Sequence, residues 1–265
     1  KSYYPVHYCD SIYIAHNTVR TSASAVKFGT ASIGGFKNVV IEDIDVFDTY
    51  RSAIALETVD GGFIHNVTVS DIKAENTNNA IFLRIGHRSG EEPGTLKNIT
   101  LENMKVEVPF GRPDTAYDMR GPALSFFYNQ FPSPITGIPG HNIENVTLEN
   151  IEITYPGRAS KGMAYIPLWR LDSVPEKVDS YPEYSMFGEL PSWGFYIRHA
   201  QGITMKDITL KIRNKDFRPA FIFDDVQDIQ MEDIQLPDND KKNIILKNTK
   251  KIDIKGKYKS MIKKY

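Results

Sequence analysis

The stretch NVVIEDI, from Asn38 to Ile44, decides the fold because it recurs along the chain. Its copies are NVTVSDI from Asn66, NITLENM from Asn98, NVTLENI from Asn145, GITMKDI from Gly202, DIQMEDI from Asp228 and, more weakly, SIYIAHN from Ser11. Within each copy the apolar residues alternate, as Val39 and Ile41 do, which is the pattern of a half-buried β-strand. The sequence therefore predicts that strands repeat along most of the chain.

A second short apolar motif follows several copies and predicts a second strand in each repeat. It reads AVKF from Ala25, AIAL from Ala53, AIFL from Ala80 and AFIF from Ala220. The shorter spacings between copies, 27, 28, 32 and 26 residues, fit one turn of a solenoid with two or three strands. We therefore expect an all-β parallel β-helix. Leucine-rich repeats and a propeller are the alternatives, but the leucine spacing of the first and the longer repeat of the second do not match.

The asparagines at the start of three copies create the glycosylation sequence N-x-T. These residues are Asn66, Asn98 and Asn145. Because they recur at one position of the repeat, we interpret them as structural residues whose side chains bond neighbouring backbone at a turn.

Two long intervals between copies predict insertions, at about 109–141 and 155–192. Both are rich in Pro, Gly and aromatic residues, and long loops on a solenoid usually gather on one face and form binding walls. Their rings, such as Trp169 and Tyr181, are candidates to stack on sugars. The alternative is that the rings only pack each loop onto the strands.

Strand alternation predicts which side chains of the second motif point outward. If Ile54 and Leu56 are buried, Glu57 points out, and the same reasoning places Lys27 and Arg84 outside. Stacking of successive repeats at about 4.8 Å would bring these charges together on one face. A later repeat adds Arg198 from GFYIRH.

Further polar residues lie just beside these strands, namely Arg51, Asp60, His87 and Arg88. A ridge of carboxylate, imidazole and guanidinium groups suits a polyhydroxylated or anionic ligand. The alternative is a set of surface ion pairs, which are common and individually weak. Asp224-Asp225 is better interpreted as a turn than as a catalytic pair.

Composition narrows the class of protein. At 41% hydrophobic and 25% charged residues the chain is a globular protein, and no stretch is long enough for a membrane helix. A net charge of −1 argues against nucleic-acid binding, although residues 241–265 form a basic terminal segment with ten lysines and one acid, Asp253. Cys9 is the single cysteine, so no internal disulfide forms. We expect one domain over 1–265.

Several stretches resemble glycoside hydrolase family 28, the polygalacturonases and rhamnogalacturonan hydrolases, over roughly residues 9–236. They are SASAVKFGTASIGGFKNV, TYRSAIALETVDGG, NAIFLRIGHR and SMFGELPSWGFYIRHA. The resemblance implies a right-handed parallel β-helix that hydrolyses pectic polysaccharides with inversion, outside the cytoplasm in a secreted or periplasmic location.

The chain departs from that family at its motifs. Ser24 stands where the family has the histidine of Gly-His-Gly, and Glu57 stands where it has the lysine of Arg-Ile-Lys. The repeat with the family's aspartate pair would precede Lys1. We therefore expect this chain to be the C-terminal part of a longer β-helix whose open end is covered by further repeats or by an oligomer contact. The alternative is that this branch has rebuilt its site from residues such as Glu57, Asp60, Arg84 and His87.

Inverting hydrolysis needs an acid and a base on two carboxyl groups. We expect Glu57, Asp60 and His87 to be catalytic, and the saccharide to be bound by Lys27, Arg51, Arg84, Arg88 and Arg198. No metal or other cofactor, nucleic acid or membrane is expected as a partner. The alternatives are a polysaccharide lyase and a carbohydrate-binding protein without activity.

Overall fold

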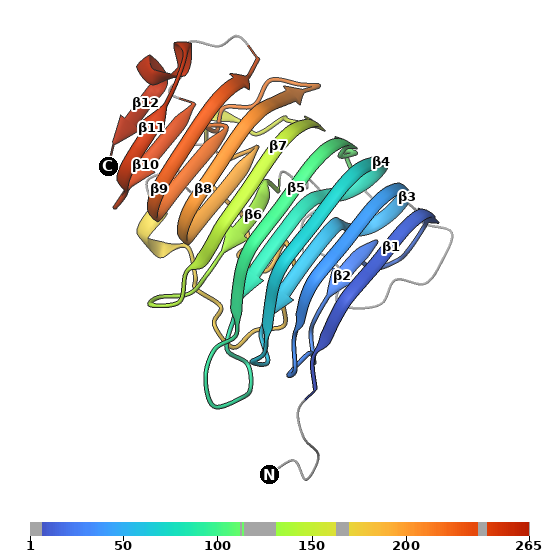
Figure 1. The fold of residues 1–265 in the computed structure, drawn as a ribbon. Coiled ribbons are helices and arrows are strands. Elements are labelled where there is room, and N and C mark those ends of the chain that lie inside the picture. Colours follow the sequence, from blue (N-terminus) through green and yellow to red (C-terminus); the bar gives the residue numbers. More distant parts are fainter. Residues whose placement is uncertain (1–6, 112, 114–130, 163–169, 238–242, 265) are drawn as a thin grey trace.

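The strands run side by side through the whole molecule, from β1 at one end to β12 at the other (Figure 1). The structure is a computed structural model and describes residues 7–111, 113, 131–162, 170–237 and 243–264. The strands are β1 Cys9–Val19, β2 Val26–Phe28, β3 Phe36–Thr58, β4 Phe63–Ile85, β5 Thr95–Glu107, β6 Ser133–Thr136, β7 Ile143–Tyr155, β8 Phe195–Ile212, β9 Phe221–Gln235, β10 Ile244–Lys247, β11 Lys250–Ile254 and β12 Ile262–Lys264. Two short 3-10 helices are η1 Leu171–Ser173 and η2 Lys257–Met261.

The sequence copies pair with one another in parallel and in register. Val39 lies opposite Val67, Val67 opposite Ile99, and Ile99 opposite Val146. Equivalent apolar side chains therefore stack from strand to strand, and each copy buries the same positions as its neighbours. This register is what places residues far apart in sequence side by side.

The predicted right-handed parallel β-helix solenoid is wrong. The chain is all-β, with 60% strand and 4% helix, but its twelve strands in sheets include a closed five-strand parallel barrel. Pairing closes this ring in the order β4, β5, β7, β8, β6 and back to β4. The sequence repeats correctly indicate which segments pair with each other, but they do not predict that the paired strands close into a ring. Closure depends on β6, a four-residue strand inside the first predicted insertion, which has no copy elsewhere in the chain.

The two motifs of a repeat do not always form separate strands. In β3 and β4 both motifs lie on one strand of 23 residues. Residues in the left-handed conformation bend these strands, for example Asn38 and Asp43 in β3, with φ values of 55° and 53°. Asn and Asp tolerate this region better than most residues, so a strand continues through a bend where the sequence predicts a turn.

The asparagines of the three sequons form a ladder of side-chain hydrogen bonds. The amide of Asn66 donates to Asn38, that of Asn98 to Asn66, and that of Asn145 to Asn98, at 2.9–3.0 Å. Their φ values are positive, as expected for bends. The interpretation as structural residues agrees with these bonds, but the acceptors are side chains of the previous repeat rather than backbone at a turn.

The main apolar core runs through the stack and includes residues from both motifs. Ile41, Leu56 and Leu83 are fully buried in it.

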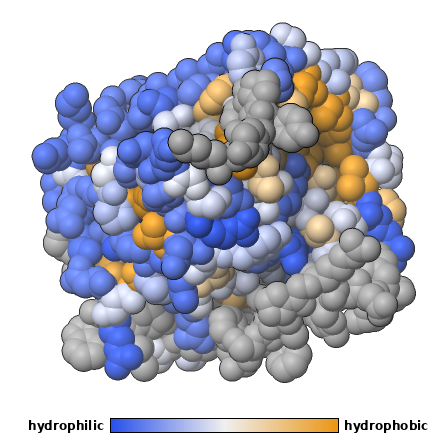
Figure 2. Space-filling model, turned by 90° about the horizontal axis from the view of Figure 1, so that it is seen from below, coloured by the Kyte–Doolittle hydropathy of each residue, from blue (hydrophilic) through white to orange (hydrophobic). Residues whose placement is uncertain are grey.

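The two ends of the stack differ. The basic terminal segment contributes β10, β11, η2 and β12, and Tyr258 from η2 is buried against the end of the main core. At the other end, Tyr13 and Ile14 of β1 are exposed. Figure 2 shows one face as largely hydrophilic with hydrophobic patches.

Residues 171–190 of the second predicted insertion lie against the sheet. Residues 170–192 are described and contain η1, whereas 163–169, including Trp169, lie outside the described residues, as does most of the first insertion. Among the helices that the structure describes, none has the length and apolar character needed to cross a membrane.

Candidate functional site

One row of polar side chains crosses the sheet at the second motif. Pairing places Glu57, Arg84, Thr136, Arg198, Asp224 and Lys247 side by side on successive strands. We call these six residues the charged row. The alternation argument therefore brings Glu57, Arg84 and Arg198 into one line, and Lys27 pairs two residues before that line, opposite Ala55.

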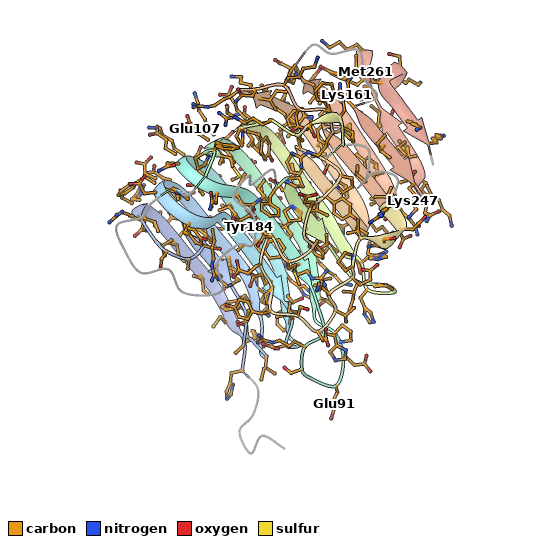
Figure 3. All side chains as sticks on the ribbon, turned by 180° about the vertical axis from the view of Figure 1, so that it is seen from behind. Glu91, Glu107, Lys161, Tyr184, Lys247 and Met261 are labelled. Carbon is orange, nitrogen blue, oxygen red and sulfur yellow. The ribbon has the colours of Figure 1, made fainter. Side chains whose placement is uncertain are left out.

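The face that carries the charged row is covered, which corrects the expectation of an exposed ridge. Residues 171–190, here the covering segment, pack on it through a second apolar cluster that is separate from the main core. The cluster consists of Ala55, Phe82, Phe131, Leu171, Val174, Tyr184, Met186, Phe187, Leu190, Tyr196, Ile222 and Ile245. Figure 3 shows Tyr184 over the middle strands and Lys247 near the C-terminal strands. Both sides of these strands are therefore buried.

Arg84 is held by the protein itself. Its side chain is 1% exposed, and it donates to Thr136 Oγ1 at 3.2 Å and to the main-chain oxygens of Gly137, Glu176 and Lys177 at 2.7–3.0 Å. The Phe187 ring lies 5.2 Å from its guanidinium carbon. Burial lowers the pKa of Arg84 to about 10, so it stays charged at neutral pH. The prediction that Arg84 points into solvent and contacts a ligand is therefore not supported by its position.

Four charged residues and one ring form a second group, here the carboxyl cluster: Lys27, Arg51, Glu57, Tyr181 and Glu183. Lys27 Nζ lies 3.0 Å from Glu57 Oε2, and Arg51 donates to Glu183. The Tyr181 ring is 49% exposed and lies 5.3 Å from Lys27 Nζ. Two ion pairs thus meet beneath a ring that is open to solvent.

The two carboxyl groups of the cluster hold protons more tightly than usual. Burial raises the pKa of Glu57 from its ordinary 4.5 to about 7, and Lys27 offsets only part of this effect. Burial also raises the pKa of Glu183, against the opposing charges of Arg51 and Lys27. The charge of Glu183 itself raises the pKa of Glu57, so the two groups titrate as neighbours. A carboxyl that is half protonated near neutral pH is suited to general acid catalysis.

Asp60 has a different environment from Glu57. Arg88 donates to both carboxylate oxygens of Asp60, and Ser89 Oγ donates at 2.9 Å. The bond from Arg88 lowers the pKa of Asp60 below its usual value. Asp60 is therefore ionised and bound on both oxygens, which suits an anchor for Arg88 better than a base. Arg88 also lies 5.5 Å from the Tyr181 ring, on the border of the carboxyl cluster.

His87 lies at the same edge of the sheet and is partly exposed. Its Nε2 lies 3.1 Å from the main-chain oxygen of Gly90, and its main-chain nitrogen donates to Val178 of the covering segment. The imidazole contact thus connects His87 to a surface turn rather than to Glu57.

Arg198 belongs to a third group of charges farther along the row. It lies 2.6 Å from Glu176 and 3.4 Å from Asp224, and it donates to the main-chain oxygen of Val174. Lys247 bridges Asp224 and Asp172. Asp224 and Asp225 are both part of β9, so the interpretation of this pair as a turn is wrong.

Sequence reasoning missed Glu176 and Glu183 because both lie in the covering segment, which has no repeat and hence no predictable register. Tyr181 was noted only as one aromatic residue of an insertion. The available signal was composition, since residues 171–190 hold five acidic residues, among them Asp172, Glu176 and Glu183, in an aromatic-rich loop opposite a strand face with several cations.

Among the described residues, no group of three or more His, Cys, Asp or Glu side chains is arranged to hold a metal ion. Comparisons of the chain with protein-family models, curated proteins and solved structures gave no match. The class of protein that the structure defines is therefore an all-β parallel-strand protein with a partly buried carboxyl cluster.

Proposed function

We propose that the protein is a glycoside hydrolase that cleaves a pectic or related polysaccharide with inversion. The observation that carries this is the buried Glu57 carboxyl, whose pKa of about 7 makes it a proton donor at neutral pH, beside the second carboxyl of Glu183. The resemblance to glycoside hydrolase family 28 adds no support, because the fold that it implies is not the fold of this chain.

The roles follow from the chemistry of glycosidic bonds. Protonated Glu57 gives its proton to the glycosidic oxygen as the bond from that oxygen to the anomeric carbon breaks. A water molecule attacks the anomeric carbon and gives a proton to the Glu183 carboxylate. Both products then carry hydroxyl groups, and a proton returns from Glu183 to Glu57 through solvent.

The ring and cations around Glu57 favour a sugar that carries a carboxylate. Tyr181 offers an exposed ring for stacking. When Glu57 is protonated, the ammonium of Lys27 no longer faces a negative charge from it, and an anionic group of a ligand takes that place. Binding of a carboxylate at Lys27 and protonation of Glu57 therefore favour each other.

The test uses the full chain with polygalacturonate, rhamnogalacturonan and a neutral galactan. We expect new reducing ends from an acidic polymer, with inverted configuration at the anomeric carbon by proton NMR. Glu57→Gln and Glu183→Gln should each lower the rate by about 100-fold or more. The exposed Glu91→Gln is the matched control and should keep the wild-type rate.

A carbohydrate-binding protein without activity is the second candidate, because both cations of the carboxyl cluster already have carboxylate partners within the chain. Binding of an acidic polymer without new reducing ends would favour it over hydrolysis. An unsaturated product that absorbs ultraviolet light would indicate a lyase instead. A chain that neither binds nor cleaves any of the polymers would contradict both candidates.

A further inference from the structure

His199 of β8 contacts a carboxylate through each of its two ring nitrogens. Nδ1 lies 2.7 Å from Asp225 Oδ2 on β9, and Nε2 lies 3.1 Å from Glu176 Oε1 in the covering segment. The side chain is 8% exposed. The imidazole thus bridges the sheet and the segment that covers it.

This geometry requires a particular protonation state. A carboxylate only accepts hydrogen bonds, and a neutral imidazole donates from only one nitrogen. Both contacts of His199 are hydrogen bonds only when the ring is the imidazolium. When the ring loses a proton, one of the two carboxylates instead faces a nitrogen lone pair.

Besides Asp225 and Glu176, charged or titratable residues from three other parts of the structure lie near His199. On its own strand, Arg198 binds the same Glu176 oxygen, and on β4, Arg84 binds the main chain of Glu176. The turn after β6 packs on the His199 main chain through Gly137 and contains His141. Burial alone lowers the pKa of His199, but the bonds to Glu176 and Asp225 outweigh it and raise the pKa above the ordinary 6.5.

We propose that His199 is a pH-sensitive contact, whose imidazolium holds residues 175–183 against β8 and β9 and whose deprotonation loosens that stretch. The loosening is local, because Val174 on one side and Tyr184 and Phe187 on the other stay packed in the second apolar cluster. The stretch carries Tyr181 and Glu183, so its attachment controls two members of the carboxyl cluster. The inference stands on these contacts and does not need the proposed hydrolysis.

The direction of the pH effect follows from the signs of the shifts. Because the pKa of His199 is raised on folding, its contribution is complete below 6.5 and is lost as the pH rises through the folded value. The pKa of Glu176 is lowered, since its bonds to His199 and Arg198 outweigh burial, so its contribution is lost in acid. The stretch is therefore held most tightly at pH values above the titration of Glu176 and below the titration of His199.

The experiment measures amide hydrogen exchange of residues 175–183 in the full chain from pH 5 to 9, divided by the exchange of unfolded chain at each pH. The wild-type protein should show about a tenfold rise in exchange across the titration of His199, since a bond to a charged group is lost. His199→Gln should exchange fast at every pH, without the step. His16→Gln is the matched control, because the His16 side chain is 74% exposed and also lies next to a carboxylate, that of Asp43.

Imidazole NMR of the wild-type protein provides a second measurement that needs no variant. His199 should be the imidazolium at pH 6.5, with its titration midpoint above that value. A midpoint at or below 6.5, or a wild-type exchange step that persists in His199→Gln, would overturn the proposal. Neither readout involves a saccharide, so its failure is separate from failure of the proposed function.

Discussion

Glu57 and Arg84 are neighbours on paired strands, both buried beneath the covering segment, yet their partners differ. Arg84 is surrounded by oxygens of Thr136, Gly137, Glu176 and Lys177, which do not titrate near neutral pH. Glu57 faces the side chain of Lys27, which reaches solvent, and its pKa is about 7. Membership of the charged row therefore does not decide whether a residue has a structural or a catalytic role. A buried charge with fixed polar partners stabilises the fold, whereas one whose neighbours are themselves titratable side chains, as Lys27 and Glu183 are for Glu57, is available for chemistry.

The largest effect that separates these two residues is on stability. Arg84→Met should lower the free energy of unfolding by about 3 kcal/mol or more, because one buried and two part-buried main-chain oxygens lose the Arg84 donor. Arg213→Met is the control. The Arg213 side chain is 55% exposed and its partner Glu107 is 46% exposed, so the loss should stay below about 1 kcal/mol. Urea unfolding of both variants measures the difference, and equal losses would show that Arg84 is not an anchor.

The same comparison shows what the sequence could predict. The repeats around Asn38 and Asn66 correctly predict parallel strands in register, and alternation correctly puts Glu57 and Arg84 on one face. They could not predict that this face is covered, because residues 171–190 have no repeat and their position depends on apolar contacts with Phe82 and Tyr196. Ring closure through β6 was missed for the same reason.

The smallest expected effect concerns Tyr181, which lies between the two regions. Tyr181→Ala should change the free energy of unfolding by less than about 1 kcal/mol, because the ring is half exposed. The same change should weaken binding of an acidic oligosaccharide by about tenfold if the ring stacks on a sugar. Calorimetric titration measures the affinity. Wild-type affinity in this variant would remove Tyr181 from the site.

The state of the Glu57 proton also affects stability. Because burial raises the pKa of Glu57 above 4.5, its contribution is complete below that value and is lost as the pH rises through about 7. The shift corresponds to a loss of the order of 3 kcal/mol at alkaline pH. Glu57→Gln keeps the uncharged form, so its stability should change less than that of the wild-type protein between pH 5 and 8.

The most direct test is the carbon-13 NMR titration of the Glu57 carboxyl in the full chain, with Glu57→Gln to assign the signal. A midpoint near 7 is expected, with a further rise in Lys27→Met because that variant removes the cation that opposes burial. A midpoint near the ordinary 4.5 would mean that Glu57 is ionised at neutral pH. Glu57 would then be one more structural charge, like Arg84, and the carboxyl cluster would hold no acid for hydrolysis.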